Sequence, residues 1–293
     1  MKRLITILKN LNQSEIEHAI EFNLYEFFRS MVHSDLKDNL YKETEEFSRF
    51  STGISFFFFN GLINNHISSE NATKKIKKNI TFFKKRKVPF LWVLGPSSTP
   101  KKMGELLIKN GFIIDKLQGM AYNLKTLNTE REIVNKVEII KIENIETLKI
   151  WNDIILMGFG FPKEVRSDFF YKAYSRILLK DRASASAFLA YYDGNPVASS
   201  LVLYKAGVAG IHMVTTLEKA RGKGIGTAIT FAPLKEAKKL GYEILVLHST
   251  EMALNMYKRM GFKEYCTIEL YIWQKNIFKT YLRKLKRLVC EFF

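Results

Sequence analysis

Apolar residues recur along the first part of the chain with two different periods. Residues 4–50 follow a helical period, and Ser14 with Glu17 forms a capping box at the start of a helix. The continuous apolar run 54–59 predicts a buried strand, and the Asn-Gly pair after it is typical of a hairpin turn. Alternately helical and extended patterns follow at residues 74–87, 89–94, 101–110 and 113–124.

A second succession of elements begins after the polar, unpatterned residues 125–136. A strand at 137–142 precedes helical patterns at 145–157 and 164–179. An antiparallel meander follows at 188–192, 196–204 and 208–216. The last elements are a helix at 225–240, a buried parallel-type strand at 244–248, a short helix at 251–260 and a strand at 263–273 that finishes the sheet. Together, the elements of both parts of the chain predict an α+β fold with a mixed, mostly antiparallel sheet flanked by helices.

A glycine-rich turn, Arg-Gly-Lys-Gly-Ile-Gly at 221–226, joins the third strand of the meander to the next helix. The first N–H groups of a helix have no partner within it, and the helix dipole favours an anion beside them. Three glycines remove Cβ atoms that would hold a diphosphate away, while Arg221 and Lys223 add positive charge. The order of residues matches neither the dinucleotide pattern nor the Walker pattern. The turn therefore predicts a diphosphate site of another kind.

The turn resembles the acyl-CoA-binding signature Gln/Arg-x-x-Gly-x-Gly/Ala of the GNAT superfamily of acetyl-CoA-dependent N-acyltransferases, with Arg221, Gly224 and Gly226 in its fixed positions. Further along, Tyr-Lys-Arg-Met-Gly-Phe at 257–262 is similar to the Tyr-x-x-x-Gly-Phe end of that superfamily's last helix. The resemblance covers residues 137–273.

The first part also resembles a GNAT domain, through the run Gly-Ile-Ser-Phe-Phe-Phe-Phe-Asn-Gly, the segment Trp-Val-Leu-Gly-Pro-Ser-Ser-Thr-Pro and a helix that ends in Gly-Phe. It lacks the signature turn, so the resemblance implies no cofactor there. We expect two GNAT-like domains in tandem, the first closing the acceptor pocket of the second. The expected boundaries are a degenerate domain at 1–125, a linker at 126–136, a catalytic domain at 137–275 and a basic amphipathic helix at 276–293.

The resemblance implies that acetyl-CoA lies along the strand before the turn, with its diphosphate on the turn itself. The implied cofactor-binding residues are Met213, Val214, Thr215, Thr216, Arg221, Gly222, Lys223, Gly224, Ile225, Gly226, Thr227, Asn255 and Tyr257. The N–H group of Val214 is the expected oxyanion donor, and Asn255 is expected to hydrogen-bond the pantetheine amides. Lys223 and Asn255 also fit ordinary solvated surface positions.

Transfer of an acetyl group to an amine needs a base for the ammonium group and an acid for the leaving thiolate. Tyr257 is the expected acid because a phenol is protonated at neutral pH, although a core position is the alternative. His212, His248 and Glu218 are the candidate bases, and a chain of water molecules or purely structural histidines are the alternatives. Residues 211–213 are Ile-His-Met where the superfamily commonly has an acidic residue, so we expect no carboxylate base on that strand.

The 293 residues, 47% of them hydrophobic, suffice for two domains with a large core. Two cysteines provide neither a disulfide framework nor metal-ligand spacing, which favours a reducing compartment and no metal. We find no persuasive signal peptide and no stretch of membrane-spanning length, and therefore expect a cytoplasmic protein.

The formal net charge is +17. The lysines are spread along the chain, so we attribute this charge to compositional bias and a polyanionic cofactor, and expect no specific nucleic acid. The cluster at 74–87 predicts a solvated helix face. The basic, amphipathic tail 277–293 is expected to dock on its own protein or a second subunit, with a membrane surface as the less favoured alternative. Either a monomer or a dimer fits.

Together these features predict an N-acetyltransferase that moves an acetyl group from acetyl-CoA to a primary amine of a small molecule or peptide, by direct attack in a ternary complex. A non-catalytic acyl-CoA-binding, sensing or scaffolding protein is the alternative. A weaker one is acylation of a basic or nucleic-acid-bound substrate. No motif identifies the acceptor.

Overall fold

The computed structural model describes residues 6–32, 39–130, 136–161, 165, 168–181 and 183–274. Its helices are α1 (Gln13–Val32), α2 (Ala72–Arg86), α3 (Met103–Lys109), α4 (Ile145–Gly158), α5 (Phe169–Ser175), α6 (Ile225–Lys239) and α7 (Glu251–Met260). Its strands are β1 (Leu40–Glu43), β2 (Ser48–Ser51), β3 (Asn60–Ile63), β4 (Phe90–Leu94), β5 (Ile113–Asn123), β6 (Val137–Lys141), β7 (Ala185–Tyr192), β8 (Asn195–Lys205), β9 (Val208–Thr216), β10 (Ile244–Ser249) and β11 (Lys263–Trp273). Short turns of other helix types are η1 (Phe57–Phe59), η2 (Leu124–Thr126), η3 (Arg176–Lys180) and η4 (Glu218–Ala220).

All eleven described strands form one sheet, in the order β1-β2-β3-β4-β11-β5-β10-β9-β8-β7-β6. Strands from the two parts of the chain interleave: β5 lies between β10 and β11, and β11 lies between β4 and β5. Among the strands of the described ranges, only β3 with β4 and β9 with β10 pair in parallel. The predicted α+β class with a mostly antiparallel sheet is confirmed. The expectation that the strand at 263–273 finishes the sheet is wrong, because β11 lies in its interior.

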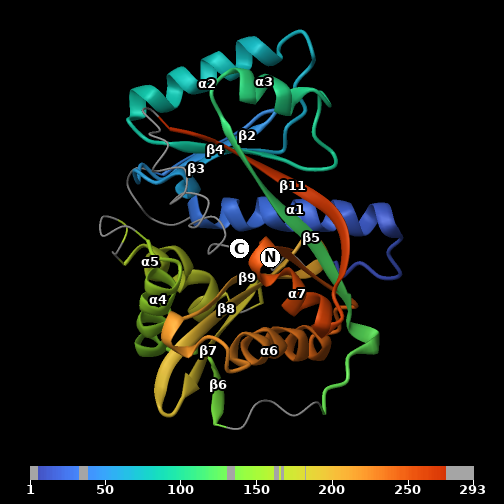
Figure 1. Cartoon of the computed structure of the whole chain (residues 1–293), viewed down its shortest axis with the longest axis vertical. Coiled ribbons are helices and arrows are strands. Elements are labelled where there is room, and N and C mark those ends of the chain that lie inside the picture. The colour runs from blue at the N-terminus through green and yellow to red at the C-terminus, as the bar shows by residue number, and fades with distance from the viewer. Residues whose placement is uncertain are drawn as a thin grey trace.

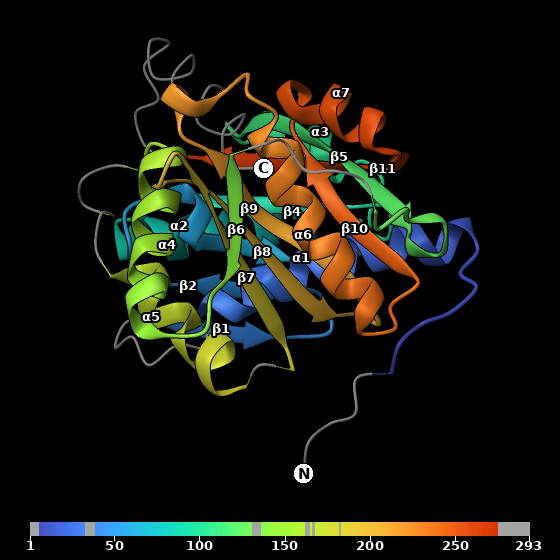
Figure 2. The ribbon, with the colours of Figure 1, turned by 90° about the horizontal axis from the view of Figure 1, so that it is seen from below.

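Helix α1 crosses the middle of the molecule and contacts β5, β8, β9, β10 and β11 (Figure 1). One side of it, including Ile20, Leu24, Phe27 and Phe28, is fully or almost fully buried. Helices α4 and α6 both pack on β7, β8 and β9, and α7 packs on β5 and β10 (Figure 2). In the described part of the chain, no helix has both the length and the apolar character that crossing a membrane requires.

Three predictions for the first 63 residues are wrong. Residues 40–43 and 48–50, expected to be helical, belong to the hairpin strands β1 and β2. The phenylalanine run expected as a strand forms the single turn η1, and the Asn-Gly pair expected as a hairpin turn begins β3. The reason lies in Asn60, whose side-chain amide donates hydrogen bonds to the carbonyls of Ile54 (2.7 Å) and Phe56 (3.0 Å) and thereby holds the turn.

Helix α6 contains Pro233, which has no N–H to donate to the carbonyl of Ile229 one turn earlier. The buried hydroxyl of Ser200 on β8 donates a hydrogen bond to that carbonyl instead, at 3.1 Å. The helix therefore remains continuous, and its first turn is fixed relative to the sheet.

Candidate cofactor and catalytic site

A β-bulge bends strand β9 at the site. Leu201 of β8 lies opposite His212, whereas Ser199 lies opposite Thr215, so β9 has one extra residue between these pairs. Met213 at the bulge has a positive φ of 53°, which is uncommon for a residue with a side chain. Its carbonyl accepts a hydrogen bond from the buried hydroxyl of Ser199 at 3.0 Å, which stabilises the bend.

Beyond the bulge, β9 separates from β10. The two strands pair in parallel only from Ala209 opposite Leu245 to Ile211 opposite Leu247. The end of β9, with Val214 half-buried, therefore diverges from the end of β10. Such a divergence leaves backbone hydrogen-bonding groups of β9 available to an extended ligand.

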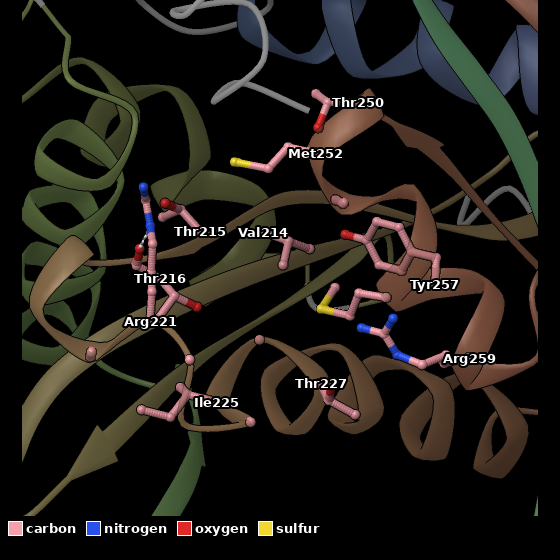
Figure 3. Close-up of a pocket in the computed structure, with 16 residues that line it drawn as sticks. Val214, Thr215, Thr216, Arg221, Ile225, Thr227, Thr250, Met252, Tyr257 and Arg259 are labelled. Carbon is pink, nitrogen blue, oxygen red and sulfur yellow. Dashed lines mark hydrogen bonds between the residues drawn. The ribbon is translucent and has the colours of Figure 1, made fainter.

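A cavity of about 450 Å³, here called the main cavity, lies along this part of β9 (Figure 3). It is lined by residues 214–216 of β9, residues 220–222 and 224–227 of the glycine turn and α6, and residues 250, 252, 253, 256, 257 and 259 in and beside α7. The turn that sequence analysis singled out and the helix with the Tyr-x-x-x-Gly-Phe end thus form opposite walls of one cavity.

The glycine turn leaves the start of α6 open to the main cavity. Gly222 (φ 79°) and Gly224 (φ 75°) adopt the left-handed conformation that glycine tolerates, and no side chain caps the helix at Gly224. A Cβ atom on Gly226 would lie 3.2 Å from Sδ of Met256 on the opposite wall. Arg221 lines the cavity and donates a hydrogen bond from Nε to the carbonyl of Thr216 at 3.0 Å. The arrangement provides unpaired N–H groups and a guanidinium group in one place.

The α7 wall supplies Tyr257 and Thr250. Tyr257 is 2% exposed, and its hydroxyl points across the cavity toward Val214 (Figure 3). Burial raises the pKa of the phenol above its usual value, and a hydrogen bond with Thr230 offsets this in part. Thr250, also 2% exposed, lines the same cavity, and within the described part of the chain its hydroxyl has no hydrogen-bond partner. An unpaired buried hydroxyl beside a cavity indicates a contact to a ligand or to water.

His212 and His248 lie behind the bulge, facing α1. Nε2 of His212 lies 2.8 Å from Oδ1 of Asn23, whose amide nitrogen donates to the carbonyl of Lys205 at 3.0 Å. Oδ1 is therefore the acceptor, and the Nε2–H of His212 donates. A Cβ atom on Gly210 would lie 1.8 Å from that oxygen, so only glycine allows this close approach.

The Nε2–H of His248 donates in the same way to the carbonyl of Ile20, at 3.0 Å. Its Nδ1 is then an acceptor, and it is buried without a partner among the described residues. Burial lowers the pKa of His248 to about 4. The pKa of His212 is lowered well below its usual value, mainly by burial and to a smaller extent by the neighbouring His248. Both imidazoles are therefore neutral at neutral pH.

A small cavity of about 10 Å³ lies between the two histidines and the bulge. Residues of α1, β9, β10 and α7 line it, and it shares Val214 and Tyr257 with the main cavity. Its volume is about that needed for one water molecule. The small cavity thus lies between the two histidines and two residues that also line the main cavity.

Three predicted site residues lie elsewhere. Lys223 does not line the main cavity, and its Nζ lies 4.5 Å from the centre of the Tyr192 ring. Asn255 and Glu218 are exposed, on α7 and η4 respectively, and neither lines a described cavity at the bulge. Met213 contacts only the small cavity. No group of three or more His, Cys, Asp or Glu side chains that could hold a metal ion occurs in the described ranges.

Sequence analysis missed five residues of the α7 wall, namely Thr250, Met252, Ala253, Met256 and Arg259. A helical spacing signal was present for some of them, because Thr250 and Ala253 precede Tyr257 by seven and four residues and so share its face. Thr250 occupies the N-cap position of α7, where threonine ordinarily has a capping role, so its residue type alone does not indicate a cavity position.

Comparison with known proteins finds a family match that spans the region of this site. Residues 151–262 match the acetyltransferase (GNAT) family. The chain carries a GNAT-family domain. All residues that line the main cavity fall within the matched range. The chain is also 29% identical over 181 residues to an uncharacterized N-acetyltransferase of Methanocaldococcus jannaschii, covering 55% of this chain and 73% of that protein.

Solved structures show that the GNAT-like fold extends beyond the matched range. A GCN5-related N-acetyltransferase from Kribbella flavida is 16% identical with a TM-score of 0.65, covering 88% of this chain and 96% of that one. A tandem GNAT protein from the clavulanic acid biosynthesis pathway has a TM-score of 0.59 at 10% identity, covering 94% and 98%. At these identities the likeness concerns the fold alone. The predicted resemblance to the GNAT superfamily is confirmed for residues 151–262.

Proposed function

We propose that this chain is an N-acetyltransferase that moves the acetyl group of acetyl-CoA to a primary amine of a small molecule or peptide, by direct attack in a ternary complex. The observation that carries the proposal is the main cavity, which joins an uncapped helix start, a diverging strand edge and a buried phenol. The three features suit the three parts of acetyl-CoA: the helix start suits its diphosphate, the strand edge suits its amide-containing arm, and the phenol suits its thioester.

The residues present fit acetyl-CoA. The N–H groups at the start of α6 suit its diphosphate, with Arg221 beside them and Arg259 on the facing wall. A side chain at Gly226 would enter the space that the ligand needs. We propose that the unpaired, buried hydroxyl of Thr250, rather than the exposed Asn255, hydrogen-bonds the pantetheine arm. When bound, acetyl-CoA supplies the acetyl group as a reactive thioester.

Val214 and Tyr257 are the proposed catalytic groups of the transfer. The N–H of Val214 lies on the diverging edge of β9, where it can stabilise negative charge on the acetyl oxygen. The Tyr257 phenol faces it and remains protonated because burial raises its pKa. It can therefore donate a proton to the sulfur as the carbon–sulfur bond breaks.

The proposed route for the amine's proton runs through the small cavity. One water molecule there would donate to the unpaired Nδ1 of His248 and accept from the attacking nitrogen. His248 is neutral at neutral pH, so it can receive that proton once attack has made the nitrogen acidic. His212 then acts as a positioning residue, since it stacks on His248 with ring centres 5.8 Å apart.

Two measurements test the proposal in sequence. Calorimetry with acetyl-CoA should show saturable binding that falls progressively from wild type to Gly226→Ala to Gly226→Leu, as the side chain fills the cavity. Release of free CoA, followed with a thiol reagent across a panel of primary amines, should then be amine-dependent. Binding without CoA release on any amine would favour the non-catalytic acyl-CoA-binding alternative. Unchanged binding by Gly226→Leu would refute the assigned site.

A further inference from the structure

The outward side of α2 carries a row of lysines without acidic partners. Helix α2 holds six lysines and one arginine and has no Asp or Glu. Five of the lysines are exposed and project within about one third of the helix circumference, since successive residues turn by 100°. We call these the α2 lysine face; they are Lys74, Lys77, Lys78, Lys84 and Lys85.

The other two cations of α2 turn toward the protein and have partners there. Lys75 forms an ion pair with Glu46, and Nε of Arg86 donates to the Ser51 hydroxyl at 3.1 Å. None of the ion pairs recorded in the described ranges includes a residue of the α2 lysine face; Lys84 does lie near the Trp273 ring, at 5.3 Å. Like charges one turn apart repel each other and destabilise a helix. An anionic partner would relieve this repulsion.

The geometry points to the phosphate backbone of a nucleic acid as that partner. We infer that the α2 lysine face binds duplex nucleic acid through its phosphates, without reading sequence. From Lys74 to Lys85 the row extends about 16 Å along the helix, a length over which a duplex presents several phosphates. No aromatic side chain belongs to this face, so it offers no platform for stacking on bases.

A membrane surface fits this face less well. Binding in the plane of a bilayer requires apolar side chains beside the cations. The exposed residues among the lysines are Thr73 and Thr81, whereas Ile76 and Phe83 are fully buried in the core beneath α2. Phe82, on the flank of the helix, is covered by the guanidinium of Arg49 at 3.7 Å. Nothing on this face can insert among lipid chains.

The inference is independent of the proposed acetyl transfer. Helices α2 and α6 lie at opposite ends of the molecule in the view of Figure 1, and α2 contributes no residue to the main cavity. Charge changes on α2 therefore leave the proposed cofactor site intact, and circular dichroism with thermal unfolding serves as a check that each variant is folded.

Fluorescence anisotropy with a labelled 20-base-pair DNA duplex of mixed sequence tests the inference over a range of salt concentrations. The test variant is Lys74→Gln/Lys78→Gln/Lys85→Gln. The matched control is Lys180→Gln/Lys239→Gln/Lys263→Gln, which removes the same charge from exposed positions outside α2. We expect the test variant to bind at least tenfold more weakly near 0.1 M salt, with the slope of log K against log salt reduced by about 3. The control should change affinity less than twofold.

Three results would overturn the inference. Equal weakening by the two variants would show that net charge alone attracts the duplex. A wild-type protein that does not bind the duplex, or binds it with no dependence on salt, would remove the partner altogether. The third result concerns vesicles of phosphatidylglycerol and phosphatidylcholine. If the wild type and the control sediment with these vesicles, the test variant does not, and none of them binds the duplex, the face belongs to a membrane surface.

Discussion

Near the separation of β9 and β10, the Thr250 hydroxyl and Nδ1 of His248 are buried without partners among the described residues. Other polar groups there, such as the Ser199 hydroxyl and the Asn23 amide, are hydrogen-bonded. Each unpaired atom belongs to a residue that lines one of the two cavities, Thr250 the main one and His248 the small one. Because unpaired buried groups cost free energy, these two atoms are where a ligand and a water molecule would contribute most.

Replacing Tyr257 by Phe should separate chemistry from binding. The variant keeps the buried ring but loses the proton donor, so we expect kcat to fall about 10²- to 10⁴-fold while the dissociation constant for acetyl-CoA stays within threefold. Steady-state CoA release and calorimetry measure the two quantities. Tyr204→Phe is the matched control, because that tyrosine is equally buried but bonds Ser186 away from both cavities. An unchanged kcat in Tyr257→Phe would exclude the phenol as the acid.

The two buried histidines should make folding stability depend on acid pH. The pKa of His248 is about 4 in the folded chain and near 6.5 when unfolded, so the unfolded state binds more protons between these values. Its contribution is fully present above pH 6.5 and is lost as pH falls toward 4, by about 3 kcal/mol in total. Denaturant unfolding at several pH values measures this loss, which His248→Gln should reduce. A loss of the same size in His248→Gln as in the wild type would contradict this account.

At the scale of elements, periodicity predicted most of the second part of the chain, including the meander, α6, β10 and α7. It failed at β1, β2 and η1 for a physical reason. A short apolar run is buried equally well as a strand or as a turn, and the choice was made by the side-chain hydrogen bonds of Asn60, which periodicity does not record. The bulge in β9 is likewise set by one hydrogen bond, from Ser199, and sequence alone gave no sign of it.

The hydrogen bond between Ser200 and α6 should contribute more to the free energy of unfolding than an ordinary hydrogen bond does. Ser200→Ala leaves the buried carbonyl of Ile229 unpaired, because Pro233 cannot donate to it, and we expect a loss of about 1–3 kcal/mol in the free energy of unfolding. In a Pro233→Ala background, the new N–H can pair with that carbonyl, so the same serine change should cost less than half as much. Chemical denaturation of the four proteins closes the cycle. Equal costs in both backgrounds would contradict this account of α6.

At the scale of the whole molecule, strand pairing was the feature that sequence could not predict. The patterns at 113–124 and 263–273 predict two strands but do not say which strands pair with them. In the structure, β5 is hydrogen-bonded on both sides to strands of the second part, β10 and β11. In turn β11 also pairs with β4 of the first part. The linker expected at 126–136 between two domains thus stays a prediction. The sheet itself contains strands from both sides of that linker.

This interleaving determines how the two parts should fold. Expressed alone, residues 1–130 would leave β4 and β5 without β11 and β10, and residues 131–293 would expose the edges of β10 and β11. Unpaired apolar strands of this kind favour aggregation, so we expect neither fragment to give a cooperative unfolding transition by circular dichroism. Co-expression of both fragments should instead yield a one-to-one complex by size-exclusion chromatography that binds acetyl-CoA. A fragment 131–293 that folds and binds acetyl-CoA alone would show that the site does not need β5, although β5 pairs with the whole length of β10.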